Sequence, residues 1–343
     1  MSADEPPRGG IVATIAEIDA APDEATLQAM LGRARAAVAA EWDRRATPTA
    51  ALAAAWSEAM RTTVATVARL VGRAEAPAWT WFVSGAVGRG EAVPGSRLET
   101  LVSLSDDVDD AGKARALVLA ADVHAVLERC GLPLDGHGVL ASRSRFCRRD
   151  VSWEDGIERW AADPAADRGV VMIGLLADAW SVTEAARGER LRPLVIAAAR
   201  RHAAARTAML RDAASVRAGI PSRLRILATQ DDRVDLEAAV IDPIVKIARW
   251  GALSAGSHAL STTDRLNHAA AGSVIDTEDA STLCDCYGAL SRIRWSRRTA
   301  PWLAGGPVDD TVSMSGLAPQ ERATIRTVAR EVGAVRRKLT GSS

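Results

Sequence analysis

The residues whose types and spacing suit chemistry lie between Trp79 and Leu104, in the sequence WTWFVSGAVGRGEAVPGSRLETLVSL. An apolar, aromatic run over residues 79–84 predicts a buried strand, and residues 96–104 predict a second one. The turn between them is dense in glycine, which lets backbone N–H groups approach an anion closely. Side chains two residues apart on a strand point the same way, so two carboxylates there can share metal ions. The pattern is typical of a phosphate-and-metal site.

This stretch resembles the signature of the nucleotidyltransferase-fold superfamily, above all the branch around bacterial PII-protein uridylyltransferases and related signal-transduction nucleotidyltransferases. That signature reads Gly, then Gly or Ser, any residue, G-R-G-E, and later Ser or Thr followed by D-x-D. The frame is kept without a gap by Gly85, Ala86, Gly88, Arg89, Gly90, Glu91, Pro94 and Ser96. Within it, Ala86 replaces the small Gly or Ser, Arg97 the first aspartate and Glu99 the second.

The resemblance implies transfer of a nucleotidyl group from an NTP to a protein or small-molecule acceptor, assisted by two Mg²⁺ ions. In the family the turn holds the nucleotide, and the residues implied for nucleotide and phosphate binding here are Ser84, Gly85, Ala86, Gly88, Arg89 and Ser96. Gly90 and Glu91 are implied to shape the turn. Arg97 and Glu99 stand at the catalytic D-x-D positions. Glu99 can ligate a metal, whereas the protonated guanidinium of Arg97 only donates hydrogen bonds.

The positive charge of Arg97 leaves two alternatives. Arg97 pairs directly with a phosphate, which gives metal-independent nucleotide binding without transfer, or Arg97 and Glu99 are solvated or pair with each other. Arg89 and Glu91 are expected to form a salt bridge across the turn. The acidic run at residues 106–110 either supplies replacement metal ligands or caps the helix that follows, and the second role is favoured.

Three functions follow from these alternatives. The favoured one is a nucleotide-binding signalling protein, a pseudoenzyme whose transfer activity is weak or lost, with a signalling protein as a further partner. The second is an active, Mg²⁺-dependent nucleotidyltransferase that uses Glu99. The third is a helical scaffold for protein interactions that has no affinity for nucleotides.

The surrounding pattern predicts an α+β fold, with a small nucleotidyltransferase-type α/β domain between helices. The predicted organisation is a disordered tail at 1–20, a helical arm at 21–75, the α/β domain at 76–145 and a helical domain at 146–343. The arm contains helices over 24–45 and 50–73, and a third strand is predicted over 138–141. No strand is predicted after Trp153. The later helices are predicted over 111–130, 152–162, 168–186, 189–217, 235–254, 276–298 and 318–339.

Composition narrows the remaining classes. Hydrophobic residues make up 48% of the 343 residues and the formal net charge is zero, which argues against nucleic acid as a partner. The longest uncharged apolar run, at 169–177, is too short to span a bilayer, so no membrane partner is expected and the cytoplasm is the expected location. The four cysteines are expected to be free, and most of the ten tryptophans to pack in the core. His137 is the histidine expected nearest the site.

Overall fold

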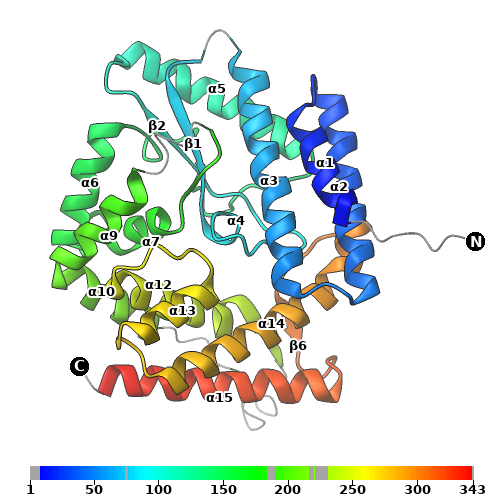
Figure 1. Cartoon of the computed structure of the whole chain (residues 1–343), viewed down its shortest axis with the longest axis vertical. Helices are drawn as coiled ribbons and strands as arrows, with labels where there is room; N and C mark the ends of the chain where they lie inside the picture. The colour runs from blue at the N-terminus through cyan, green and yellow to red at the C-terminus, as the bar shows by residue number, and fades with distance from the viewer. Residues whose placement is uncertain (1–7, 74–75, 184–189, 216–219, 221–230, 342–343) are drawn as a thin grey trace, which may run out of the picture. The chain divides into compact units, whose positions relative to one another are not determined.

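The computed structural model describes residues 8–73, 76–183, 190–215, 220 and 231–341, and helices make up most of it (Figure 1). The fold is α+β, as the sequence predicts. The chain forms two compact units. The N-terminal unit comprises residues 1–156, 178–194 and 299–306, and the C-terminal unit comprises residues 157–177, 195–298 and 307–343. Each unit is therefore assembled from segments that are far apart in the sequence.

Three helices that contact one another open the N-terminal unit: α1 (Arg8–Asp19), α2 (Glu24–Arg44) and α3 (Thr49–Gly72). The prediction of helices over 24–45 and 50–73 is confirmed. The prediction of a disordered tail at 1–20 is wrong for residues 8–19, and its first seven residues lie outside the described ones. Ile11 and Ile18 of α1 are buried, so this short helix is stabilised by packing against its neighbours.

A four-stranded sheet lies beside these helices, with the strand order β3-β2-β1-β4. Its strands are β1 (Trp79–Val83), β2 (Thr100–Leu104), β3 (Cys147–Arg149) and β4 (Trp180–Ser181). The central strands β1 and β2 are antiparallel and all their residues are buried, because helices α3 and α5 (Asp110–Arg129) pack in the same unit. This burial on both faces explains the continuous apolar run over residues 79–83.

Two strand predictions are wrong in part. The second strand was predicted over 96–104, but only residues 100–104 form a ladder. The residues before it are extended and bonded singly: the Leu98 N–H donates to Pro133 O at 2.8 Å, and the Ser84 N–H donates to Glu99 O at 3.0 Å. The third strand was predicted over 138–141, but these residues form no strand. The third strand is β3, at residues 147–149, which pairs parallel to β2. Gly138, at φ +83°, turns the chain away from an extended path where that strand was expected.

A single-turn helix and a distant segment complete the N-terminal unit. The helix is α4 (Gly85–Gly88), which follows β1 directly. Trp302, near the end of α14 (Thr277–Leu303), packs edge-to-face on Trp56 with ring centroids 4.8 Å apart. The guanidinium of Arg35 lies 5.4 Å from the centre of the Trp302 ring. Residues 299–306 are thus held to the N-terminal unit by an aromatic and a cation–π contact.

Helices dominate the rest of the chain. They are α6 (Asp150–Ala162), the 3₁₀ turn η1 (Ala166–Arg168), α7 (Gly169–Ala177), α9 (Leu191–Arg201), α10 (Ala203–Ala214), the π-helical turn η2 (Glu237–Ile241), α12 (Asp242–Ala255), α13 (Thr262–Ala271), α14 and α15 (Pro319–Gly341). The helix predicted over 168–186 ends at Ala177, and residues 184–186 lie outside the described ones. The helix predicted over 189–217 is divided at His202, which is extended. Its residues 189, 216 and 217 also lie outside the described ones.

The prediction that no strand follows Trp153 is wrong. Besides β4, a two-stranded antiparallel ribbon of β5 (Arg233–Asp235) and β6 (Thr311–Ser313) lies in the C-terminal unit. The helix predicted over 318–339 is confirmed as α15, and an apolar stripe of this helix is buried: Ile325, Val328, Val332 and Val335. Within the described part of the chain, no helix is long and apolar enough to cross a membrane.

Candidate functional site

The glycine turn after β1 is a single helical turn whose geometry requires glycine. Ser84 is extended, Gly85 follows at φ +61°, and the Gly88 N–H donates to Ser84 O at 3.0 Å. A Cβ added to Gly88 would lie 2.1 Å from the backbone oxygen of Asp178 and 2.8 Å from that of Val83. Backbone atoms at these distances cannot move aside independently, so position 88 accepts only glycine.

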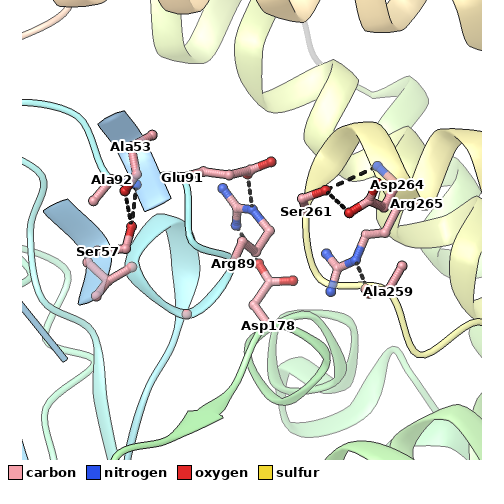
Figure 2. Close-up of polar contacts among 12 residues, drawn as sticks. Ala53, Ser57, Arg89, Glu91, Ala92, Asp178, Ala259, Ser261, Asp264 and Arg265 are labelled. Atoms are coloured by element: carbon pink, nitrogen blue, oxygen red, sulfur yellow. Dashed lines mark hydrogen bonds and ion pairs between the residues drawn. The ribbon is translucent and has the colours of Figure 1, made fainter. Parts of the chain in front are cut away.

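A buried ionic cluster fixes the end of this turn (Figure 2). The Arg89 Nε donates to Glu91 Oε2 at 2.7 Å, and its Nη1 donates to Asp178 Oδ2 at 2.5 Å. The side chains of Arg89, Glu91 and Asp178 are 8%, 10% and 1% exposed, so the cluster is shielded from water. The predicted salt bridge between Arg89 and Glu91 is confirmed. Asp178 was not predicted as its third member, because 89 residues separate it from Arg89.

Two side chains of α3 support the same turn and were not predicted from the sequence. The Ser57 hydroxyl accepts from the Ala92 N–H at 2.9 Å and donates to Ala53 O at 2.7 Å (Figure 2). Arg61 donates from Nε to Val87 O at 3.0 Å and from Nη2 to Gly88 O at 2.8 Å. These bonds tie α3 to the last carbonyls of α4, of which Val87 O also accepts from the Gly90 N–H at 3.2 Å.

Trp180 lies on the other side of Arg61. The Arg61 guanidinium is 4.3 Å from the centre of the Trp180 ring, and burial lowers its pKa from the ordinary arginine value. Trp180 is 38% exposed and is an exception to the expectation that most tryptophans pack in the core, whereas Trp153, Trp160 and Trp295 are fully buried. Trp180 instead shields the arginine that holds the glycine turn.

Arg97 and Glu99 lie on the extended segment that leads into β2, and they point to different surroundings. Arg97 is exposed, and its Nη1 donates to Leu134 O at 3.2 Å. Glu99 is half-buried, and its carboxyl carbon and both oxygens lie 2.9 Å from where a Cβ on Gly85 would stand. The Glu99 carboxylate is therefore in contact with the glycine turn. Among the residues that the structure describes, no carboxylate lies within 4.0 Å of the Arg97 guanidinium, so Arg97 and Glu99 do not form an ion pair.

The other predicted phosphate-binding residues have local roles as well. The Ser96 hydroxyl accepts from the Val93 N–H at 2.9 Å and closes the turn before the extended segment. Ser84 is 1% exposed and bonds to Glu99 through its N–H. The carbonyl of Ala86 accepts from the Glu91 N–H at 2.8 Å. The predicted residues around the turn are thus brought together in one place, around Gly85 and Glu99.

 The acidic run at residues 106–110 makes local contacts. Asp109 caps α5, since its Oδ1 accepts from the Gly112 N–H at 2.7 Å. Asp106 accepts from the Val151 N–H at 2.9 Å, and Asp110 pairs with Arg149 at 2.7 Å. In the described ranges no group of three or more His, Cys, Asp and Glu side chains is arranged to hold a metal ion. The contacts of the acidic run are those of a helix start and a loop closure.

His124 of α5 lies at the centre of a buried network beside the site. Its Nε2 lies 2.9 Å from the Thr100 hydroxyl and its Nδ1 lies 3.0 Å from the Ser142 hydroxyl. The Thr100 hydroxyl also accepts from the Ala141 N–H at 3.0 Å, so His124, Thr100 and the segment at residues 141–142 form one hydrogen-bonded network. Burial lowers the pKa of His124 to about 4. The network joins α5 to the first residue of β2 and to Ser142.

Comparison with known protein families identifies the class to which this arrangement belongs. Residues 33–167 match the family described as "Putative nucleotidyltransferase DUF294", and residues 202–342 match the family described as "Putative nucleotidyltransferase substrate binding domain". The chain therefore belongs to this nucleotidyltransferase family, with its C-terminal domain, as the resemblance of residues 79–104 implies. No curated protein sequence matches the chain.

Proposed function

We propose that this protein binds the phosphate groups of a nucleotide without a metal ion, and that it acts as a nucleotide-binding signalling protein and not as an efficient transferase. The observation that carries the proposal is the state of Arg97. Its guanidinium is exposed at the first position of the D-x-D pair, and within the part of the chain that the structure describes it donates to the carbonyl of Leu134 and pairs with no carboxylate. A guanidinium without a carboxylate partner is suited to a charge-assisted, bidentate bond with a phosphate.

The donor set does not suit the pair of Mg²⁺ ions that the family resemblance implies. Mg²⁺ requires oxygen ligands in near-octahedral geometry, and Arg97 offers a positive charge in place of an oxygen. Glu99 is the remaining carboxylate of the pair, and it lies against Gly85. Loss of one metal ion from a two-metal site removes several kcal/mol of transition-state stabilisation. These features support nucleotide binding with impaired transfer.

The turn itself supports a phosphate ligand at this place. Gly85 lacks a side chain and adopts φ +61°, so its backbone can approach an anion closely. The cluster of Arg89, Glu91 and Asp178 and the bonds from Arg61 hold the turn rigidly in one conformation. A rigid turn loses little conformational entropy when a ligand binds. Arg89 contributes to this rigidity, since its charge is matched by two carboxylates.

Calorimetric titration of ATP, UTP, GTP and CTP in the presence of EDTA or of Mg²⁺ tests the proposal. We expect binding in EDTA, and a loss of at least tenfold in affinity in Arg97→Gln. Arg115→Gln is the matched control. Arg115 is an exposed arginine on α5 of the same unit, and it is not among the described side chains that bond to the glycine turn. Binding that requires Mg²⁺ would support the active enzyme instead. Unchanged affinity in Arg97→Gln, or no binding under either condition, would refute the proposal.

A further inference from the structure

A second exposed arginine, Arg143, contacts the loop of residues 134–138, which Arg97 also contacts. Arg143 packs its guanidinium against Gly138: the Nη1, Cζ and Nη2 atoms lie 2.1, 2.3 and 2.7 Å from where a Cβ on Gly138 would stand. Any side chain at position 138 would displace this guanidinium. Gly138 also adopts φ +83°, a conformation that favours glycine. The glycine thus provides the space that Arg143 occupies.

Arg97 contacts the same loop two residues earlier. Its Nη1 is 3.2 Å from Leu134 O and 4.0 Å from where a Cβ on Gly136 would stand. Consecutive Cα atoms are about 3.8 Å apart, so Gly136 and Gly138 lie within about 8 Å of each other and the two guanidiniums within roughly 16 Å. Both side chains are exposed and long, and neither is fixed by an ion pair. They can therefore approach one ligand together.

The loop between the two arginines is held in shape by its own hydrogen bonds. Leu98 and Leu134 form a parallel bridge, and the Asp135 N–H donates to Leu98 O at 2.9 Å. The Asp135 carboxylate accepts from the Val139 N–H at 2.8 Å. The loop is thus held by bonds that do not involve Arg143, and a change in Arg143 removes a surface charge without removing any of these bonds.

Arg97 and Arg143 both contact this loop, and Asp135 is a carboxylate of the loop itself. Over the ranges that the structure describes, neither Arg97 nor Arg143 has a carboxylate within ion-pair distance. His137, also on the loop, is exposed. An anion that contacts both guanidiniums neutralises both charges, and a ligand with two or more phosphate groups can do so. A single phosphate reaches one guanidinium more readily than two.

We propose that Arg143 is a second phosphate-binding residue, which acts with Arg97 so that the site prefers nucleoside di- and triphosphates to monophosphates. This inference rests on the proposed metal-independent binding at Arg97. The permanent positive charges of two arginine side chains would thereby neutralise the phosphates, as metal ions do in a metal-dependent site. The loop of residues 134–138, which contacts both arginines, would thus determine how many phosphate groups the site recognises.

Titration of ATP, ADP and AMP in EDTA tests this inference on the full chain, with Arg143→Gln, Arg143→Lys and the control Arg115→Gln. We expect the unchanged protein to bind ATP and ADP at least tenfold more tightly than AMP. Arg143→Gln should weaken ATP and ADP at least fivefold and leave AMP unchanged, and Arg143→Lys should recover part of the loss because it keeps the charge. Circular dichroism of each variant checks that the fold is kept.

The outcomes separate this inference from the proposed function. If Arg143→Gln binds ATP as the unchanged protein does while Arg97→Gln does not, Arg143 has no role and the proposed function stands. Equal affinity of the unchanged protein for AMP and ATP also overturns the role of Arg143. If the unchanged protein binds no nucleotide in EDTA, both proposals are wrong.

Discussion

The buried histidine His124 makes the stability of the N-terminal unit depend on pH. Its folded-state pKa is lowered to about 4 by burial, from an ordinary value of 6.5. A lowered pKa means that the fold favours the neutral imidazole. The stabilising contribution is therefore fully present above pH 6.5 and is lost as the pH falls from 6.5 towards 4, because the unfolded chain binds the proton first. The difference between these two pKa values corresponds to roughly 3 kcal/mol of unfolding free energy, of which about 2–3 kcal/mol is lost by pH 4.5.

The assay is urea unfolding, followed by tryptophan fluorescence, of the unchanged protein and of His124→Gln between pH 8 and pH 4.5. Glutamine keeps a polar side chain at this position but does not titrate, so the difference between the two proteins isolates the histidine. We expect this difference in unfolding free energy to shift by about 2–3 kcal/mol over that range, at the expense of the unchanged protein. NMR titration of the His124 ring protons reads the pKa directly. The reasoning is refuted if the unfolding free energies of the two proteins change in parallel with pH, or if the pKa of His124 lies near 6.5.

Two further predictions concern the glycine turn. Gly88→Ala places a Cβ 2.1 Å from the Asp178 backbone oxygen, and we expect it to cost about 3 kcal/mol or more of unfolding free energy in urea. Gly32→Ala on α2, which has nothing within 4 Å, is the control and should be neutral or stabilising; equal effects would contradict the close contact. Asp178→Asn leaves Arg89 with one carboxylate in a buried place and should cost about 3–5 kcal/mol in the same assay. A cost below 1 kcal/mol would show that water reaches Arg89.

The helices and the first strand could be predicted because their patterns are local. The apolar stripe of α15 and the continuous apolar run of β1 each follow from residues that are neighbours in the sequence. The strand β4 has two residues, too few for a period to be seen. The strand β3 follows a loop rich in arginine, and its place beside β2 depends on a distant pairing.

The candidate site was predicted in its residue types and only partly in its contacts. The glycine frame indicated the turn, and the two carboxylate positions indicated where Arg97 and Glu99 would stand. Asp178, Ser57 and Arg61 were missed because they reach the turn from segments with no motif of their own. Arg143 was missed because its guanidinium occupies the space left by Gly138, which has no side chain. Gly138 and Arg143 lie five residues apart in a loop, where no sequence period indicates a contact.

The segmented N-terminal unit has a consequence for biosynthesis. Asp178, which pairs with Arg89, and Trp302, which packs on Trp56, belong to the unit yet are made long after its strands β1 and β2. During translation Arg89 can pair with its second carboxylate only after Asp178 has emerged from the ribosome. Trp56 can pack against Trp302 only after residue 302 has emerged. A nascent chain of this protein thus carries an incomplete core for most of its synthesis. Folding of this unit is expected to finish only after Trp302 has left the ribosome.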